Sequence, residues 1–277
     1  MKSLPRISVI TPSFNQAAFI EHTILSVIGQ GYPNLEYIVI DGGSTDGSVE
    51  VIRKFENRIA YWVSEKDRGQ SHAINKGMQR ATGDIFAYLN SDDYYLEGAL
   101  ARVAEHFVCH PDADLFHGRC RVVDQHGGTI SVRSGSITRY EEILDLWDVW
   151  WNKRNFVQPE VFWTKRMTDK IGPFREDLLW VMDYEYWLRI LRARGGVCFI
   201  NAELAAFRIQ PNQKSRQSER SVDEMVQLVR PFIFDEDHSI SRFKRLELKG
   251  KWIFQVGFQD EIRISQQKNE PRWRRLV

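Results

Sequence analysis

Short apolar runs alternate with segments of helical spacing over the first 95 residues of the chain. β-Branched and aliphatic residues dominate the runs, which is typical of strands buried on both faces. Between the runs, apolar positions recur every three or four residues, which predicts helices. The expected strands cover residues 6–12, 35–40, 60–63 and 85–89, and the expected helices cover 17–28, 48–55 and 71–81. Strands and helices that alternate across short connections predict a parallel sheet with right-handed crossovers.

The second half of the chain is less regular. Its pattern predicts three helices, a hairpin around Gln125–Gly128 and three short strands, and it becomes helical again from Ser221. The helices are expected over 97–107, 140–147 and 183–193, the hairpin strands over 114–124 and 129–133, and the short strands over 161–164, 197–200 and 205–208. Gln210–Arg220 is polar and is expected to form a mobile loop. The predicted class is α/β, with a Rossmann-like, mostly parallel central sheet flanked by helices and a small C-terminal helical extension.

Polar side chains follow each of the four expected strands. Thr11 and Pro12 end the first strand, Asp41 ends the second, Asp67 lies in the loop after the third, and Asp92–Asp93 follow the fourth. In parallel sheets, ligands bind beyond the carboxyl ends of the strands. The pattern therefore predicts one binding site at this edge of the sheet.

Asp92 and Asp93 are adjacent carboxylates, which repel each other unless a positive group lies between them and a ligand. Hard oxygen ligands suit Mg²⁺ or Mn²⁺, so the pair is a candidate site for a divalent cation that carries a diphosphate. The alternative is that these acids cap the next helix. Asp41 likewise either accepts hydrogen bonds from a base or ribose, or belongs to a Gly-rich turn with a capping Asp46.

Other nucleotide-binding and metal motifs are missing from the sequence. Neither G-x-G-x-x-G nor G-x-x-x-x-G-K-[ST] follows the first strand, which disfavours a dinucleotide dehydrogenase and a P-loop protein. Asp41–Gly47 is not a calcium loop, because Ile52 stands where the bidentate acid is required. Three cysteines without a C-x-x-C pair fit a reducing compartment, and they fit neither a disulfide framework nor a zinc site.

Asp183 opens a strongly amphipathic helix. It either matches the helix dipole as a first-turn acid, or acts as a general base that takes a proton from an acceptor hydroxyl. Glu185 is the rival base. Four cations are candidates to neutralise a diphosphate, with solvated surface charge as the alternative: Arg68, Lys76, Arg208 and Lys214.

Composition narrows the class of protein further. The 277 residues are 43% hydrophobic and 27% charged, which predicts a large folded α/β domain with a small appendage. A net charge of +1 gives no argument for a nucleic-acid partner. The N-terminus runs directly into a strand, and no apolar run approaches the length of a membrane span. We therefore expect a cytoplasmic protein.

Six segments carry a more specific signal. They are Ile7–Asn15, Val39–Gly47, Asp67–Gln70 with Ala73–Gly77, Leu89–Asp93, Gln158–Pro159 and Met182–Glu185. In this order and spacing, they resemble the inverting family 2 glycosyltransferases with the GT-A fold, over about residues 6–215. The resemblance implies transfer of a sugar from a nucleotide-diphosphate sugar to a hydroxyl acceptor, in the synthesis of a cell-surface polysaccharide or glycoconjugate.

The resemblance also implies roles for individual residues. Thr11 and Pro12 would line the nucleotide pocket, and Asp41 would bind the base or ribose. Asp67 and the loop that follows it would lie on the nucleotide side. Lys76, one of the four candidate cations above, is expected near the diphosphate on the basis of its charge. Asp92 matches the last acid of the family's D-x-D segment, and with Asp93 it is expected to hold Mn²⁺ or Mg²⁺ and the ribose–diphosphate. Asp183 matches the catalytic base. Three positions depart from the family pattern: Asn90, Met182 and Gln210.

On this basis, residues 1–215 are expected to form a GT-A domain. Within it, residues 1–95 would bind the nucleotide sugar and residues 96–215 a saccharide or lipid-linked saccharide acceptor. Residues 216–277 would form a helical, basic extension, which either packs on the core or contacts the inner face of an anionic membrane. A non-catalytic nucleotide-sugar-binding module remains the alternative function. A nucleotidyltransferase is disfavoured, because Ser13–Gln16 is not a Gly-rich basic loop.

Overall fold

The computed structural model describes residues 4–211, 213, 214, 218–235 and 239–266. The chain divides into two compact units, Met1–Met225 and Val226–Val277. The boundary between the units lies inside helix α9 (Ser218–Phe234).

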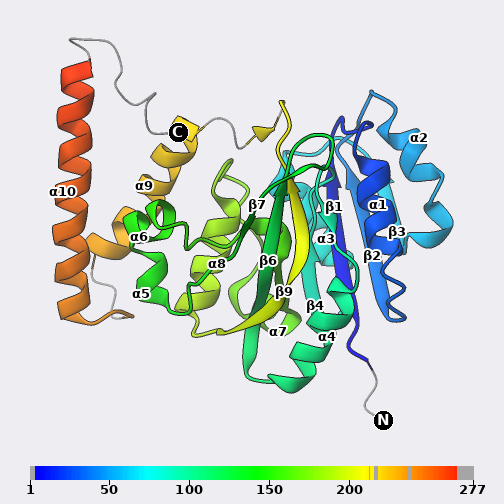
Figure 1. Ribbon diagram of the computed structural model, residues 1–277, viewed down its shortest axis with the longest axis horizontal. Coiled ribbons are helices and arrows are strands. Elements are labelled where there is room, and N and C mark those ends of the chain that lie inside the picture. The colour runs from blue at the N-terminus through cyan, green and yellow to red at the C-terminus, as the bar shows by residue number, and fades with distance from the viewer. Residues whose placement is uncertain (1–3, 212, 215–217, 236–238, 267–277) are drawn as a thin grey trace. The chain divides into compact units, whose positions relative to one another are not determined.

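The alternating pattern of the first half is confirmed. Strands β1 (Ile7–Ser13), β2 (Leu35–Asp41), β3 (Tyr61–Ser64) and β4 (Ile85–Tyr88) are parallel and lie in the order β3-β2-β1-β4 (Figure 1). The helices between them are α1 (Ile20–Ile28), α2 (Ser48–Arg53) and α3 (Gln70–Arg80), with a 3₁₀ turn at Glu56–Arg58. Ser13 lies opposite Asp41, and Asp41 lies opposite Ser64, so three strands end side by side.

Successive side chains of β1 face opposite sides of the sheet, as a strand requires. Ile7 and Val9 belong to the hydrophobic cluster that includes residues of α1. Ile10 faces α3 instead, where a Cβ on Gly77 would lie 2.4 Å from Ile10 Cγ2. Because only glycine permits this approach, Gly77 sets how closely α3 packs on β1.

The sheet continues into the second half of the chain, where it becomes mixed. Strand β8 (Val161–Thr164) is antiparallel to β4 and to β6 (Ala113–Val123), whereas β9 (Gly196–Arg208) is parallel to β6. The short β5 (Tyr94–Tyr95) and β7 (Thr129–Arg133) are antiparallel additions on β9 and β6. The helices are α4 (Ala99–Cys109), α5 (Tyr140–Ile143), α6 (Leu146–Trp151), α7 (Lys165–Ile171) and α8 (Met182–Arg192), with a 3₁₀ turn at Gln158–Glu160.

Two strand and helix predictions for the second half are wrong, and the loop expected over 210–220 ends earlier, because α9 already begins at Ser218. The strands expected at 197–200 and 205–208 are one strand, because β9 keeps pairing with β6 through the polar residue Glu203, which lies opposite Arg119. The helix expected at 140–147 is two helices. The break falls at Asp145, whose side chain accepts a hydrogen bond from Asp148 N at 3.2 Å and caps α6.

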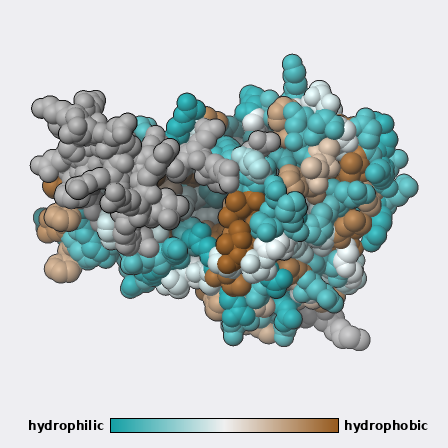
Figure 2. Space-filling view, turned by 45° about the horizontal axis from the view of Figure 1, so that its top comes forward, coloured by the Kyte–Doolittle hydropathy of each residue, from teal (hydrophilic) through white to brown (hydrophobic). Residues whose placement is uncertain are grey.

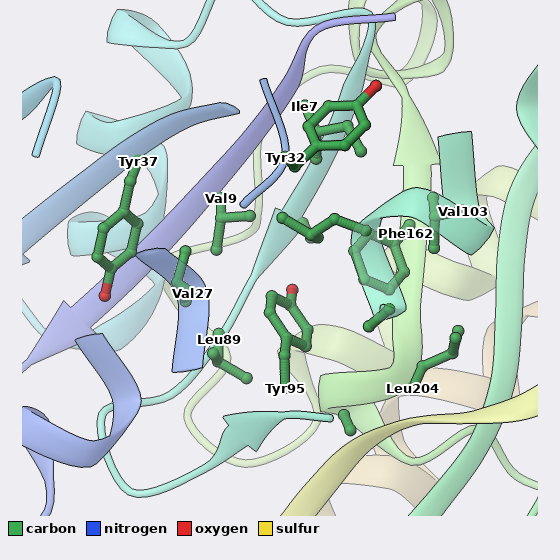
Figure 3. Packing of buried hydrophobic residues seen from close by; sticks show 14 of the residues in the cluster. Ile7, Val9, Val27, Tyr32, Tyr37, Leu89, Tyr95, Val103, Phe162 and Leu204 are labelled. Atoms are coloured by element: carbon green, nitrogen blue, oxygen red, sulfur yellow. The ribbon is translucent and has the colours of Figure 1, made fainter. Parts of the chain in front are cut away.

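Hydrophobic packing joins both halves of the sheet. One cluster combines residues of α1 and α4 with strands from both halves, and within it Tyr95 and Phe162 stack with ring centroids 5.5 Å apart (Figure 3). On α8, Tyr186 stacks on Phe174 at 3.9 Å, and Trp163 of β8 packs edge-on against Tyr186 at 5.4 Å. Aromatic pairs of this kind contribute about 0.5–1.5 kcal/mol each beyond their burial, so they fix α8 against the sheet.

The second unit contains the end of α9 and helix α10 (Arg242–Gln266). Phe234 of α9 and Trp252 of α10 pack edge-on, with ring centroids 6.1 Å apart. Among the described residues, no helix combines the length and the apolar character that a membrane crossing requires.

Candidate active site

Asp41 organises the turn that follows β2. Its side chain is fully buried, and it accepts hydrogen bonds from Gly43 N (3.0 Å), Ser44 N (2.8 Å), Ser44 Oγ (2.5 Å) and Ser64 Oγ (2.7 Å). The turn is tied to the loop after β1, because Asn15 N donates to Ser44 Oγ at 2.8 Å. Asp41 thus links the ends of the first three strands.

Asp46 binds the start of α2, as the alternative interpretation of this turn suggested, although the N-cap position of that helix is Gly47. Its Oδ1 accepts from Ser48 N and Ser48 Oγ at the start of α2, at 3.0 and 2.6 Å. Its Oδ2 accepts from Ala17 N at 2.9 Å. The neighbouring carboxylates Asp41 and Asp46 therefore hold the first two loops of the site in one conformation.

Thr11 and Pro12 are both buried in β1. Thr11 Oγ1 accepts from the Tyr37 hydroxyl at 3.1 Å, so the hydroxyl of Thr11 points toward the core on the α1 side. Ser13, which the sequence did not single out, ends the same strand. Its buried Oγ has no hydrogen-bond partner among the residues that the structure describes.

Asp67 lies against the turn after β2, as expected for adjacent strand ends. A Cβ on Gly42 would be 2.6 Å from Asp67 Oδ2, and Asp67 Oδ1 accepts from Gly69 N at 2.8 Å. Lys76 of α3 lies farther along the same segment, and its Nζ is 2.5 Å from Glu65 Oε1. The structure therefore brings Asp67 to the Asp41 turn and pairs Lys76 with the loop after β3.

Asp92 and Asp93 follow β4, where Asp92 is partly buried and Asp93 is buried. Gln210 Nε2 donates to Asp92 Oδ2 at 3.2 Å, and Arg208 N donates to Asp93 Oδ1 at 2.8 Å. Burial raises the pKa of both carboxyls, and the charge of Asp92 raises the pKa of Asp93 further. Asp93 Oδ2 is buried and has no hydrogen-bond partner in the described part of the chain.

Arg208 is not the open cation that the sequence suggested. Only 5% of it is exposed, and its guanidinium donates to Asp92 O (2.9 Å), Gln125 O (3.0 Å) and His22 Nδ1 (2.9 Å). It also lies over the ring of Tyr94, 5.3 Å from the centroid. Burial and the charge of Arg208 lower the pKa of His22. Arg208 therefore fastens the Asp92–Asp93 segment to β9 and α1.

Asn90 stands at the centre of a chain of side-chain amides. Gln70 Nε2 donates to Asn90 Oδ1 at 2.7 Å, and Asn90 Nδ2 donates to Gln158 Oε1 at 3.1 Å. Gln158 Nε2 then donates to Tyr88 O at 2.7 Å, and Lys214 Nζ donates to Gln70 Oε1 at 3.2 Å. An aspartate at position 90 could accept but not donate, so the asparagine fits this chain.

Asp183 lies in the first turn of α8 and is partly exposed. Its Oδ1 accepts from Tyr184 N at 2.7 Å. Burial raises the pKa of Asp183, and the charge of Lys214 opposes that shift. The rival Glu185 is buried, and both of its oxygens accept from the guanidinium of Arg189, at 2.8 and 2.9 Å. Asp183 is therefore the accessible carboxylate of the two.

Glu224 is a site-supporting residue that sequence reasoning missed. From α9 it accepts hydrogen bonds from three consecutive backbone N–H groups before α8: Leu179 (2.8 Å), Trp180 (2.7 Å) and Val181 (2.9 Å). Nothing in the sequence marks this acid among the polar residues around it. The contact depends on a fold that brings positions 45 residues apart together.

Two carboxylates of the site are the candidates for holding a divalent cation together with a diphosphate. The described residues contain no group of three or more His, Cys, Asp or Glu side chains that could hold a metal. Magnesium sites, however, often use one or two carboxylates, with water and substrate phosphates completing the shell. Asp92 and Asp93 are two adjacent carboxylates, and Oδ2 of Asp93 is buried without a hydrogen-bond partner among the described residues, so this oxygen is open to a cation.

The sequence of the chain matches a known protein family. The family model described as "Glycosyl transferase family 2" matches residues 8–175, which is more than half of the chain. A putative teichuronic acid biosynthesis glycosyltransferase, TuaG of Bacillus subtilis, is 37% identical over 117 residues, which cover 41% of this chain and 46% of the relative. An uncharacterized glycosyltransferase of Haemophilus influenzae is 32% identical over 133 residues, covering 47% of this chain and 53% of the relative.

A longer match is a PGL/p-HBAD biosynthesis glycosyltransferase of Mycobacterium bovis, which is 28% identical over 204 residues and 72% of each chain. By contrast, the chain spans about half the length of the Bacillus subtilis and Haemophilus influenzae relatives. Among solved structures, residues 1–349 of S. aureus TarS in complex with UDP-GlcNAc match with a TM-score of 0.69 at 17% identity, over 95% of this chain and 77% of that one. This likeness confirms the predicted GT-A fold.

Mannosyltransferase PcManGT of Pyrobaculum calidifontis, in complex with GDP-Man and Mn²⁺, matches with a TM-score of 0.63 at 21% identity. The match covers 85% of this chain and 66% of that one. At this identity the likeness concerns the fold, which two neighbours with different donors share.

Proposed function

Because the chain belongs to glycosyl transferase family 2, we propose that it transfers a sugar, with inversion, from a nucleotide-diphosphate sugar to a hydroxyl group of an acceptor. The names of TuaG and of the mycobacterial relative support a role in the synthesis of a cell-surface polysaccharide or glycoconjugate. The TarS and PcManGT complexes support a nucleotide-sugar donor. The proposed cellular location is the cytoplasm. The proposed acceptor is a saccharide or a lipid-linked saccharide.

One relationship carries the proposal. Asp183, an accessible carboxylate, lies within electrostatic reach of Lys214, which bonds to Gln70 and through it to Asn90, two residues before Asp92. The charges of Asp183 and Asp93 both raise the pKa of the buried Tyr88 hydroxyl, after burial itself. A base and a carboxylate pair therefore flank one region, as a direct displacement requires.

In the proposed reaction, Asp183 accepts the proton of the acceptor hydroxyl while that oxygen forms a bond to the anomeric carbon. The bond from this carbon to the diphosphate breaks on the opposite side, which inverts its configuration. Asp92 and Asp93 would hold Mn²⁺ or Mg²⁺, which when bound offsets the charge on the departing diphosphate. The positive charge of Lys214 favours the ionised form of Asp183, because it opposes the rise in pKa that burial causes.

The donor would bind along the ends of β1 to β3. We assign the base and ribose to the end of β1, where Thr11 and Pro12 precede Ser13, and to the Asp41 turn, since β1 and β2 end side by side. Asp67 would contact the same side, because it lies against Gly42. Lys76, now paired with Glu65, would contribute positive charge near the diphosphate. The buried hydroxyl of Ser13 offers a further polar group at the same edge.

Two measurements test this function. A thermal-shift panel of UDP, GDP, dTDP and CDP, each with and without Mn²⁺, is expected to show a metal-dependent rise for one nucleotide; no shift with any of them would contradict a donor site. Asp183→Asn is expected to lower transfer by about 10³-fold with the nucleotide shift retained. Full turnover in that variant would reject Asp183 as the base. Nucleotide binding by the wild-type chain without any transfer or donor hydrolysis would instead favour the alternative, a non-catalytic nucleotide-sugar-binding module.

A further inference from the structure

Helix α10 carries a stripe of exposed apolar side chains. The exposed fractions are 81% for Phe243, 69% for Leu246, 65% for Ile253 and 78% for Phe254. At 3.6 residues per turn, these four positions fall within an arc of about 100° on the helix. Gly250 belongs to the same arc, and a Cβ built on it would meet no atom within 4 Å. Large exposed apolar patches of this kind mark interaction sites.

The stripe is separate from the surface that α10 uses for folding. Leu248 and Trp252 project from the opposite side of the helix and are almost fully buried. Trp252 packs on Phe234 of α9, and Lys249 Nζ donates to Phe234 O at 3.4 Å. The helix thus has one face committed to its own unit and another that faces outward.

Basic residues border the stripe on both sides. By helical position, Arg242 and Lys249 lie along one border, and Lys244 and Lys251 lie along the other. Glu247 is the one acid between positions 242 and 254, and it pairs with both Lys244 (2.9 Å) and Lys251 (3.1 Å). The borders of the stripe therefore carry excess positive charge.

We infer that α10 lies on the surface of an anionic lipid bilayer, with this stripe inserted between the headgroups and the basic borders on the lipid phosphates. An outward apolar face with Lys and Arg along its edges is the signature of an interfacial helix. A second copy of α10 is a poorer occupant, because the basic borders of two identical helices would repel each other. The inference does not depend on the proposed transfer reaction.

Co-sedimentation of the full chain with phosphatidylcholine vesicles, with and without phosphatidylglycerol, tests the inference. The chain is expected to pellet only with the anionic vesicles, and less so as salt rises. Phe243→Ser with Leu246→Ser is expected to reduce the pelleted fraction about tenfold. The matched control is Ile130→Ser with Val132→Ser, which removes two exposed apolar residues of β7 and is expected to change nothing.

Equal pelleting of the α10 variant and the wild-type chain would overturn the inference. So would light scattering that shows a dimer which only the α10 variant loses, because the stripe would then bind a second copy. Transfer to a soluble acceptor is measured in parallel. If the α10 variant keeps transfer but no longer pellets, the membrane contact is supported. If the wild-type chain pellets with the vesicles but transfers no sugar, only the proposed function is rejected.

Discussion

Glu224 holds the start of the helix that carries Asp183, because its Oε2 accepts the backbone N–H of Val181 at 2.9 Å, two residues before that aspartate. The same carboxylate binds the N–H groups of Leu179 and Trp180. Charged acceptors at a helix N-terminus are stabilised both by these donors and by the helix dipole. The direction in which Asp183 points therefore depends on a side chain from α9.

Replacing this anchor is expected to damage catalysis more than binding. Glu224→Ala leaves three N–H groups without their charged acceptor, which should lower the free energy of unfolding by ~2 kcal/mol or more. The kcat for transfer is expected to fall at least tenfold. The KM for the donor should stay nearly unchanged, because the substitution does not touch the ends of β1 to β3, where the donor is proposed to bind. Steady-state kinetics and urea unfolding measure the two effects. Glu105→Ala, at an exposed position of α4, is the matched control.

A purely structural role for Glu224 would give a different result. In that case the Ala variant, assayed well below its unfolding midpoint, would keep the wild-type kcat. Glu224→Gln separates the two further, since an amide oxygen can still accept from the backbone but carries no charge. We expect an intermediate kcat for the Gln variant.

The pH dependence of transfer should report on Asp183 and Lys214. Burial raises the pKa of Asp183, and only the ionised form can accept a proton, so kcat should be lost, as pH falls, at a higher pH than for an ordinary aspartate. Lys214 opposes this shift, so Lys214→Gln should move the acidic limb of the profile to still higher pH. Lys153→Gln, at an exposed position, should leave the limb in place. An unmoved limb in the Lys214 variant would remove the lysine from the mechanism.

Restoring an acid at position 90 should harm this protein. Asn90→Asp cannot donate to Gln158 Oε1, which now receives a 3.1 Å hydrogen bond, and it adds charge beside Asp92. We expect a loss of ~1–3 kcal/mol in stability and no gain in Mn²⁺-dependent nucleotide binding. Thermal unfolding and Mn²⁺ titration of the nucleotide complex are the measurements. Asn57→Asp, on the exposed 3₁₀ turn, serves as control; a tighter Mn²⁺ response in Asn90→Asp alone would show that the amide chain is dispensable.

The first half of the fold could be predicted because its strands and helices each bury one continuous apolar pattern, from Ile7 to Tyr88. The positions of Asp41 and Asp92 at strand ends followed from that pattern alone. The partners of these residues could not be predicted, because they come from distant segments. Arg208 illustrates this limit, since a lone arginine in the sequence gives no sign that three acceptors and two aromatic rings will bury it.

Irregular elements escaped prediction for a related reason. Asn201 and Glu203 interrupt the apolar pattern of β9, yet pairing with β6 carries the strand through them. Helix α7 is short and mostly polar, so its pattern is weak, and its start depends on Thr164 Oγ1 accepting from Met167 N at 3.3 Å. Long-range pairing and local caps decided these elements, and neither leaves a periodic signal.

The buried Glu160 should make the protein less stable as pH rises. Burial raises the pKa of its carboxyl from 4.5 to about 8, and the carboxyl accepts Val157 N at 3.1 Å. Between these two values the folded state binds a proton that the unfolded state releases, so the free energy of unfolding falls by roughly 3–5 kcal/mol across that window. Glu160→Gln keeps the shape of the side chain but cannot titrate. The difference in the free energy of unfolding between variant and wild type, measured in urea, should therefore change by that amount from pH 5 to pH 8. A constant difference would mean that Glu160 is ionised in the folded protein.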